Sequence, residues 1–291
     1  MEEYLLTTNE FDQFRKLIHK KVGIFLADGK RNLVQSRLRK RLAHYSLSTY
    51  QMYYDLLVSL PESDGEWTEF INCVTTNKTD FYREAHHFKF ITEQFIPEML
   101  ARAKTDDGAA KIRVWHAGCS SGEEPYTLAI TLQEALRGKG TWDVKQLASD
   151  IDTQVLAHAA AGIYDMERVA PIPQALLSRY FLRGTGSNSG MVRVKSLLRD
   201  QIAFRQINLL GSPWPFPATT RFDVIFCRNV VIYFDKPTQR TLFQRFSQLL
   251  RPGGYLFLGH SESLLGISDA FDSLGRTIYR LPELGAVRLA A

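Results

Sequence analysis

The strongest constraint on the fold is an alternation of strand-like and helix-like segments that begins at residue 111. The strand-like stretches are 111–117, 144–149, 222–227 and 254–259, and the helix-like stretches are 123–136, 153–161 and 237–250. Because a helix after each strand returns the chain to the same edge of a sheet, this order indicates parallel strands covered by helices. With a final strand predicted at 276–281, we expect a doubly wound α/β domain.

Residues 164–206 interrupt this alternation. They contain three short stretches of strand character, at 180–183, 191–195 and 201–205, with a glycine-rich turn at 184–190. Short strands joined by such a turn are typical of antiparallel pairing. We therefore predict a small antiparallel β-subdomain inserted into the α/β domain.

The first 110 residues have the periodicity of helices. Phe11, Phe14, Ile18 and Val22 recur at spacings of three and four residues, which gives one apolar helix face. Further helices are predicted at 33–45, 48–59, 66–73 and 88–102. The predicted domains are a helical N-terminal domain at 1–85, a connecting helix and linker at 86–110, and an α/β domain at 111–285 that contains the 164–206 insertion.

Composition argues against several classes of protein. The chain is 45% hydrophobic and 23% charged, as in ordinary soluble globular proteins. No apolar run approaches the roughly 20 residues of a membrane span, and the acidic N-terminus does not resemble a signal peptide. Cys73, Cys119 and Cys227 form no CxxC pair and no zinc-ligand spacing. We expect a cytoplasmic, monomeric protein without a metal.

A basic segment lies within the predicted N-terminal helices. Residues 29–54 contain no Asp or Glu, and they contain the cationic side chains Lys30, Arg31, Arg37, Arg39, Lys40 and Arg41. Such a local field attracts an acidic partner. RNA is one candidate, but RNA-binding surfaces interleave aromatic side chains as stacking platforms. Because no aromatic residue lies between Lys30 and Arg41, no nucleic acid partner is expected.

The turn GCSSG at 118–122 allows two interpretations. It matches G-x-S-x-G, the nucleophile elbow of hydrolases, but that elbow follows several strands, whereas 111–117 is the first strand here. It also suits a ligand-binding turn, since glycines let the backbone approach a ligand at a helix N-terminus. Glu123 and Glu124 at that helix end would repel phosphate and suit the cationic, hydroxyl-rich S-adenosylmethionine. Alternatively, they only complement the helix dipole.

Two more stretches favour S-adenosylmethionine. The second strand ends in ASDID, and an acidic residue there can accept hydrogen bonds from both ribose hydroxyls. We assign Asp150 to the ribose and Asp152 to the N-cap of the following helix. The helix, Pro-Gly-Gly turn and strand of LLRPGGYLFLGH at 249–260 resemble the end of the sheet in class I methyltransferases, although Pro-Gly pairs also mark ordinary turns.

Six sequence blocks, in order along the chain, resemble the CheR family, the S-adenosylmethionine-dependent methyltransferases of bacterial chemoreceptors. The blocks are TTNKTDFYREAHHF at 75–88, WHAGCSSGEEPYTLAI at 115–130, ASDID at 148–152, FRQINLL at 204–210, FDVIFCRNVVIYFD at 222–235 and RPGGYLFLGHSES at 251–263. The resemblance runs from about residue 10 to residue 282. It implies a Rossmann-like class I methyltransferase sheet with an inserted small antiparallel β-subdomain, preceded by an all-α domain that docks on the receptor.

The resemblance also implies an activity and partners. Members of the family methylate glutamate side chains on the cytoplasmic helices of chemoreceptors, giving methyl esters in sensory adaptation and S-adenosylhomocysteine as product. A glutamate is already ionised at neutral pH, with an unperturbed pKa of about 4.3. It needs no strong general base, which agrees with a chain that offers no convincing His-Asp or Cys-His dyad. In some members the β-subdomain binds the receptor's C-terminal peptide by strand addition, and 179–195 resembles that insertion.

Roles for particular residues follow from the same resemblance. The expected catalytic residues are Arg83 and Tyr233. The expected cofactor-binding residues are Asn77, Thr79, Arg83, Gly118, Glu123, Asp150, Asn208, Leu209, Arg228 and Asn229. The expected receptor-docking residues are Arg37, Arg39, Lys40 and Arg41. Two alternatives stay open: a non-catalytic adaptor of the same fold that binds S-adenosylmethionine, and a methyltransferase for RNA or a small molecule, which only the basic segment supports.

Overall fold

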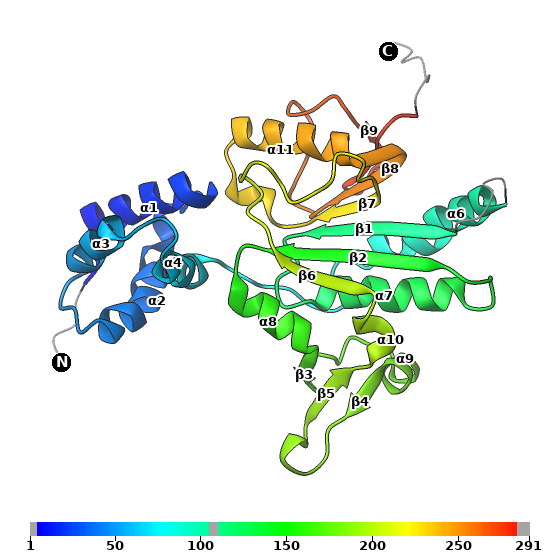
Figure 1. Cartoon of the computed structure of the whole chain (residues 1–291), viewed down its shortest axis with the longest axis horizontal. Coiled ribbons are helices and arrows are strands. Elements are labelled where there is room, and N and C mark those ends of the chain that lie inside the picture. Colours follow the sequence, from blue (N-terminus) through cyan, green and yellow to red (C-terminus); the bar gives the residue numbers. More distant parts are fainter. Residues whose placement is uncertain (1–4, 105–109, 284–291) are drawn as a thin grey trace.

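The N-terminal part of the protein is helical, and the rest is an α/β domain (Figure 1). This arrangement comes from a computed structural model, which describes residues 5–104 and 110–283. The described helices of the N-terminal part are α1 (Thr8–Val22), η1 (Asp28–Lys30), α2 (Arg31–His44), α3 (Tyr50–Ser59) and α4 (Gly65–Val74). The predicted all-α domain is thus confirmed.

Local signals set both ends of α1. Thr7 and Glu10 form a capping box at its start, in which each side chain accepts a hydrogen bond from the backbone N–H of the other. Gly23 ends the helix in the left-handed conformation, with a φ of 71°. A Cβ at Gly23 would lie 2.1 Å from Leu210 Cδ1, so the glycine lets α1 end directly against the α/β domain.

A long helical segment connects the two parts. The helix α5 (His86–Phe90), the π-helical turn η2 (Ile91–Phe95) and the helix α6 (Ile96–Ala103) follow one another without a break, as the prediction at 88–102 anticipates. Buried side chains of this segment pack against α7 (Glu123–Leu136) and one face of the sheet. Of the predicted polar linker, residues 105–109 lie outside the described residues.

A seven-stranded sheet forms the centre of the α/β domain, in the order β6-β2-β1-β7-β8-β10-β9. The strands are β1 (Lys111–Ala117), β2 (Asp143–Asp150), β6 (Ile202–Gln206), β7 (Phe222–Cys227), β8 (Leu250–Leu258), β9 (Asp272–Ser273) and β10 (Ile278–Arg280). The first five strands of the order are parallel, and β10 is antiparallel to β8. Because the strand order reverses beside β1, the carboxyl ends of β1, β2 and β7 frame a crevice for a ligand.

Helices cover both faces of this sheet (Figure 1). Val224 and Phe226 of β7 pack beneath the connecting segment and α7, whereas Ile225 and Cys227 pack against α11 (Lys236–Leu249) on the other face. This alternation with a period of two is that of a strand buried on both sides. The helix α8 (Thr153–Ala161) packs beside α7. The parallel, doubly wound sheet predicted from the sequence is confirmed.

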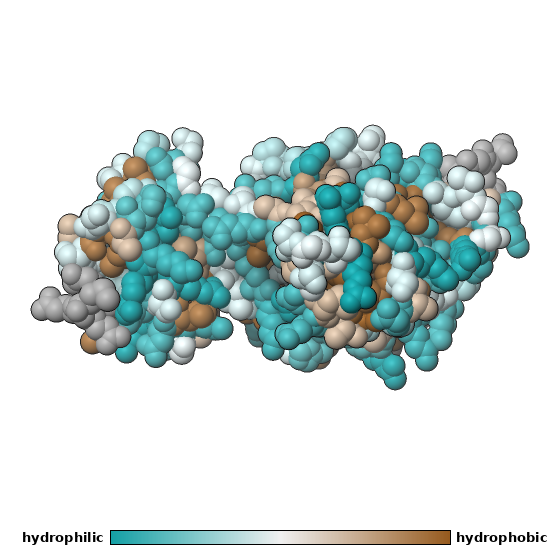
Figure 2. Space-filling model, turned by 90° about the horizontal axis from the view of Figure 1, so that it is seen from below, coloured by the Kyte–Doolittle hydropathy of each residue, from teal (hydrophilic) through white to brown (hydrophobic). Residues whose placement is uncertain are grey.

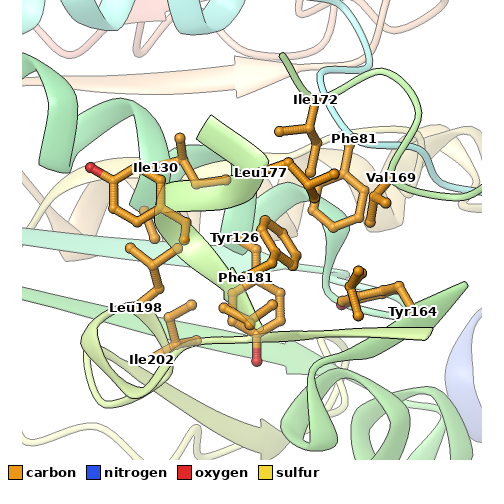
Figure 3. Packing of buried hydrophobic residues seen from close by; sticks show 14 of the residues in the cluster. Phe81, Tyr126, Ile130, Tyr164, Val169, Ile172, Leu177, Phe181, Leu198 and Ile202 are labelled. Carbon is orange, nitrogen blue, oxygen red and sulfur yellow. The ribbon is translucent and has the colours of Figure 1, made fainter. Parts of the chain in front are cut away.

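The inserted β-subdomain is also present, but its strands differ from the prediction. They are β3 (Ile163–Asp165), β4 (Phe181–Arg183) and β5 (Met191–Val194), in the order β3-β5-β4. The stretch predicted at 201–205 belongs to β6, which pairs in parallel with β2 in the main sheet. Strand β3 is only three residues long, so it has no recognisable period. The subdomain is fixed to the body by α9 (Gln174–Tyr180), α10 (Ser196–Arg199) and a shared core that includes Phe81, Tyr126 and Phe181 (Figure 3).

The space-filling view shows two lobes joined at a narrower waist (Figure 2). The waist is held by direct contacts. Asn208 Nδ2 donates to the carbonyl oxygen of Lys21, and the Phe25 N–H donates to the carbonyl oxygen of Tyr233. Among the described residues, no helix combines the length and apolarity that crossing a membrane requires.

Candidate active site

A cavity of about 300 Å³ lies at the waist, between the helical domain and the carboxyl edge of the sheet. The sheet contributes the residues that follow β1, β2 and β7, at 118–120, 150–151 and 228–230. The helical domain contributes Val22 at the end of α1 and residues 24–27 after it, and the chain that begins at the end of α4 contributes residues 74–80. This is the edge at which ligands of doubly wound sheets bind.

The turn after β1 is shaped by residues in the left-handed conformation. Gly118 and Gly122 have φ values of 97° and 96°, and Ser120 has a φ of 49°. A Cβ at Gly118 would lie 2.3 Å from Val230 Cγ2, so only glycine fits against the loop that follows β7. The Ser120 hydroxyl donates to the carbonyl oxygen of Asn77 rather than to a histidine. This placement gives no support to the hydrolase interpretation.

Asp150 and Asp152 have the two different roles that the sequence assigns to them. Asp152 caps α8 by accepting hydrogen bonds from the N–H groups of Gln154 and Val155. Asp150 lines the cavity, and its carboxylate accepts hydrogen bonds from the N–H groups of Ser120 (2.8 Å) and Asp152 (3.0 Å). Burial raises the pKa of Asp150, although these N–H donors favour the ionised form. The remaining lone pairs of the carboxylate are available to hydroxyl donors in the cavity.

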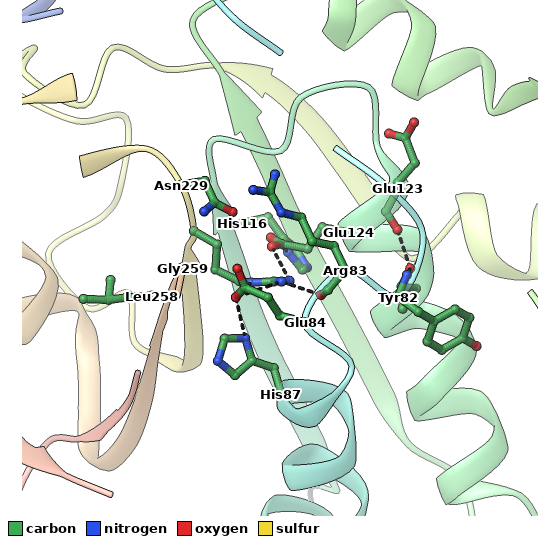
Figure 4. A network of polar contacts seen from close by, with 12 residues as sticks. Tyr82, Arg83, Glu84, His87, His116, Glu123, Glu124, Asn229, Leu258 and Gly259 are labelled. Atoms are coloured by element: carbon green, nitrogen blue, oxygen red, sulfur yellow. Dashed lines mark hydrogen bonds and ion pairs between the residues drawn. The ribbon is translucent and has the colours of Figure 1, made fainter. Parts of the chain in front are cut away.

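Glu123 and Glu124 require a correction to the prediction. Glu123 is predicted to contact the cofactor, but its carboxylate accepts from the Ser121 hydroxyl and pairs with Arg168, and it does not line the cavity. Glu124 lines the cavity instead. Figure 4 shows the two side chains pointing in different directions. Neighbouring helix positions project about 100° apart, so only one of the pair can face the ligand.

A buried charge network lies beside the cavity (Figure 4). Arg228, of which 3% of the side chain is exposed, pairs with Glu84 at 3.2 Å and with Glu124 at 3.1 Å. Glu124 also pairs with His116, whose Nδ1 lies 2.8 Å from its carboxylate. Burial alone would raise the pKa of Glu84, but Arg228 and His260 overcome it and lower the pKa to about 2. The network therefore keeps its carboxylates ionised.

Arg83 lies on a short segment with unusual backbone geometry. Its neighbours Tyr82 and Glu84 have φ values of 56° and 57°, in the left-handed region that few residues other than glycine occupy. The Arg83 guanidinium lines the cavity, where its Nη1 donates to the carbonyl oxygen of Lys78. The Arg83 carbonyl oxygen accepts a hydrogen bond from Arg228. The charge network thus holds the backbone on the C-terminal side of Arg83, and the Thr127 hydroxyl accepts from the Tyr82 N–H on the other side.

Tyr233 belongs to η4 (Val231–Tyr233), the short 3-10 turn that follows β7. Its side chain is half-buried and lines the cavity together with Asn229. Burial raises the pKa of Tyr233, so the hydroxyl stays protonated near neutral pH and serves as a hydrogen-bond donor. The structure therefore places Arg83 and Tyr233, which are 150 positions apart in the chain, around the same cavity.

The remaining predicted cofactor residues also line the cavity: Asn77, Thr79, Asn208, Leu209, Arg228 and Asn229. Two of their amide side chains are already engaged. Asn77 Nδ2 donates to Asp152 Oδ2 at 2.6 Å, and Asn208 Oδ1 accepts from the N–H of Leu210. These contacts fix the walls of the cavity, so Asn77 and Asn208 present backbone atoms or remaining lone pairs to a ligand.

Comparison with known proteins decides the family. The family description "CheR methyltransferase, SAM binding domain" matches residues 77–280, and "CheR methyltransferase, all-alpha domain" matches residues 9–75. The chain belongs to the CheR methyltransferase family.

Curated relatives of this CheR chain span nearly its whole length. A chemotaxis protein methyltransferase of Klebsiella aerogenes is 45% identical, over 96% of this chain and 91% of its own length. Chemotaxis protein methyltransferase 2 of Pseudomonas aeruginosa is 45% identical, over 96% of this chain and 95% of its own. The chemotaxis protein methyltransferase of Escherichia coli is 43% identical, over 97% and 94%. Methyltransferase activity is thus the activity of this family.

The cavity of this CheR chain fits S-adenosylmethionine. Asp150 is 9% exposed and lines the cavity, and a carboxylate has lone pairs enough to accept from hydroxyl donors, such as those of a ribose, as well as from backbone N–H groups. Ile151, Ile207 and Leu209 supply apolar surface for a purine, and Arg83 supplies a cation for a carboxylate. Among the described residues, no cluster of His, Cys, Asp and Glu could hold a metal ion.

The predicted receptor-docking residues on α2 divide into two pairs. Arg41 is ion-paired with Glu66, and its side chain is 15% exposed. Arg37 donates to the backbone carbonyl oxygens of Cys73 and Thr75. Both charges are committed inside the helical domain, because they lie on the flank of α2 that faces α4. Arg39 and Lys40 are exposed, so the docking expectation is reduced to this pair.

Several residues of the site carry no recognisable signal in the sequence. The segment 22–27 forms one wall of the cavity, but its apolar residues look like ordinary core. Glu84 and Glu262 also give no local sign of their roles, although each lies in a block that carries the family resemblance. The left-handed backbone at Glu84 is accompanied by long-range contacts of its carboxylate to Arg228 and His260, and the Tyr82 N–H donates to the Thr127 hydroxyl; no local pattern encodes these contacts.

Proposed function

We propose that this chain transfers a methyl group from S-adenosylmethionine to glutamate side chains on the cytoplasmic helices of chemoreceptors, forming methyl esters in sensory adaptation. One observation carries the proposal. A single cavity at the carboxyl edge of the sheet gathers Asp150, Arg83 and Tyr233 from three separate segments of the chain. Family membership and relatives named as chemotaxis protein methyltransferases support the substrate class.

S-adenosylmethionine supplies a methyl group on a positively charged sulfur. Asp150 would hold the ribose, and Leu209 would lie against the adenine. Glu124 and the backbone after Gly118 would lie near the methionine end, where Glu124 adds negative charge to the wall. The cavity wall contains three acidic residues, Asp80, Glu124 and Asp150, and this agrees with a ligand that carries no phosphate.

The chain's own residues then align the incoming carboxylate. A glutamate is ionised at neutral pH, so the site need not remove a proton; it must orient one oxygen toward the methyl carbon and strip water from it. Arg83 would pair with that carboxylate through its guanidinium. The protonated Tyr233 hydroxyl would donate to the second oxygen, which leaves the attacking oxygen unengaged.

The helical domain would carry the receptor contact. Receptor methylation helices are rich in glutamate, and Arg39 and Lys40 present exposed positive charge on α2. Contacts of this kind contribute association rate and salt sensitivity more than affinity. The edge strands β3 and β4 of the small sheet would be available to add a strand from a receptor's C-terminal peptide.

The test is transfer of a radiolabelled methyl group from S-adenosylmethionine to membranes that contain chemoreceptors from the same organism. Base-labile label on the receptor band is expected, because a methyl ester hydrolyses in base. Asp150→Ala should abolish the label by weakening cofactor binding, and Tyr233→Phe should reduce it while calorimetry still shows binding. Cofactor binding without any receptor label would instead support a non-catalytic adaptor.

A further inference from the structure

The Glu262 carboxylate is buried and engaged with the backbone. It is 5% exposed, it does not line the cavity, and it accepts four hydrogen bonds from main-chain N–H groups. Oε1 accepts from Val230 (2.9 Å) and Ile232 (3.3 Å). Oε2 accepts from Asn229 (2.8 Å) and Gly259 (2.6 Å). Three of the four donors belong to the loop that carries Tyr233 into the cavity.

The turn at 259–262 also reaches the segment that carries Arg83. The backbone N–H of His260 donates to Glu84 Oε1 at 3.1 Å, and His260 Nδ1 lies 3.0 Å from the same oxygen. The Glu262 N–H closes the turn by donating to the carbonyl oxygen of Gly259. The turn at 259–262 therefore contacts the loop 229–232, which precedes Tyr233, on one side and Glu84, which follows Arg83, on the other.

Close packing makes this turn rigid. A Cβ at Gly259 would lie 2.4 Å from Asn229 Nδ2 and 2.8 Å from Asn229 N, so the two backbones touch. Asn229 itself has a φ of 59°, and Glu84 has a φ of 57°. Strained backbone of this kind persists only where surrounding contacts hold it in place.

We infer that the 259–262 turn sets the position of Arg83 relative to Tyr233, with Glu262 as the positioning residue for the Tyr233 loop and His260 for the Arg83 segment. Neither side chain touches the substrate. Glu262 has no exposed face from which to do so, and His260 acts through Glu84. The inference rests on the proposed function, because it assigns these residues to the same methyl transfer.

The first test is Glu262→Gln in the full-length protein. Glutamine keeps the shape, but its –NH₂ group would face N–H donors of the Asn229–Ile232 loop or of Gly259, so at least one contact becomes repulsive. The fraction of protein that binds S-adenosylhomocysteine is measured by calorimetry, and kcat is calculated per binding-competent molecule. We expect this normalised kcat to fall by about tenfold to a hundredfold. The KM for S-adenosylmethionine should change by less than about threefold. Ser261→Ala, an exposed position in the same turn, is the matched control.

Hydrogen–deuterium exchange provides a readout that needs no receptor. Glu262→Gln should accelerate amide exchange in peptides that cover 228–234, while α3, which lies outside this network, should be unchanged. Unaltered exchange at 228–234 together with an unaltered normalised kcat would overturn the inference. If the wild type labels no receptor, the proposed function fails, and the exchange result alone decides whether the turn holds the loop.

A second pair of variants guards against misfolding of Glu262→Gln. The His260 side chain is 66% exposed, so its replacement does not threaten the core. His260→Ala removes the imidazole contact with Glu84, so kcat should fall by about threefold to tenfold. The loss stays within this range because the backbone N–H of residue 260 still donates to Glu84. His260→Asn, whose amide can donate from the same position, should restore kcat to within about twofold. Equal activity of wild type and His260→Ala would contradict the positioning role.

Discussion

His87 is a neutral histidine inside a charged neighbourhood. Its side chain is fully buried, and Nε2 lies 3.1 Å from the carbonyl oxygen of Arg276. Burial and the nearby Arg228 guanidinium lower the pKa of His87 to about 4. The facing groups are Glu84, Arg228 and His86. A proton on His87 would therefore place a second positive charge beside Arg228 with little water to screen it.

This environment predicts a loss of stability in mild acid. The unfolded chain protonates His87 near pH 6.5, whereas the folded protein does so near pH 4. Between these values the unfolded state binds more protons, so stability should fall as pH decreases from about 6.5 to 4, by up to about 3 kcal/mol. Chemical unfolding of His87→Gln across this range should show a flatter pH dependence, and His86→Gln should behave like wild type. If the unfolding free energy of His87→Gln depends on pH as steeply as that of the wild type, the loss of stability in acid does not come from His87.

Arg41 and Lys40 are adjacent cations with different environments, so their substitutions should separate stability from docking. Arg41→Ala would leave Glu66 buried with only tyrosine partners, and should cost about 3 kcal/mol in thermal or chemical unfolding. Lys40→Ala should change stability by less than about 0.5 kcal/mol, but should slow receptor methylation at low salt. Equal methylation by Lys40→Ala and wild type at low salt would remove Lys40 from the docking surface.

At the scale of secondary structure, the elements buried on both sides were predictable and the short ones were not. The predicted stretches 111–117, 123–136 and 222–227 coincide with β1, α7 and β7, because each is a long apolar or amphipathic run with clear ends. Strand β3 has three residues and β6 ends in polar ones. Their partners are chosen by tertiary pairing with β5 and β2, which no local periodicity records.

The residues of the site were likewise predictable only where their roles are local in the sequence. The positions of Asp150 and Asp152 could be assigned from a strand end and a helix start, since each role is local. The choice between Glu123 and Glu124 depended on how α7 is rotated about its axis, which distant contacts with Arg168 and Arg228 determine. Glu262 could not be assigned because three of its four partners are main-chain groups about 30 residues away.

Helix α8 and the linker after α4 share one carboxylate, and this predicts a separable effect on the cofactor. Asp152 Oδ1 caps the helix, while Oδ2 accepts from Thr75 Oγ1 and Asn77 Nδ2. Asp152→Asn should keep the cap, because asparagine is as good an N-cap as aspartate, but should lose the acceptor for Asn77. We expect near wild-type unfolding with about tenfold weaker binding of S-adenosylhomocysteine by calorimetry, equivalent to about 1.4 kcal/mol. Unchanged affinity would show that the linker holds its position without Asp152.

In the whole molecule, the cofactor cavity belongs to both domains. The α/β domain supplies the strand ends, and the segment after α1 covers the opposite side through Phe25 and Leu26. A ligand that contacts both walls of the cavity should therefore stabilise both domains against unfolding. The gain in the free energy of unfolding is RT ln(1 + [L]/Kd), or about 2.7 kcal/mol when the ligand concentration is a hundredfold its dissociation constant.

Hydrogen exchange with saturating S-adenosylhomocysteine checks this expectation. Peptides from 22–33 in the helical domain should be protected together with those from 118–122 after β1, and both effects should be lost in Asp150→Ala. Protection confined to 118–122 would show that the helical domain does not contact the ligand.

The cavity wall and the basic helix are one continuous piece of chain. Lys30 lines the cavity at the end of η1, and α2 begins at the next residue, Arg31. A receptor helix that binds α2 and a cofactor that binds beneath η1 would thus act on the same segment. If occupancy of one site changes the affinity of the other, thermodynamic reciprocity requires the reverse effect to have the same factor. Product left in the cavity would then alter how long the enzyme stays on its receptor.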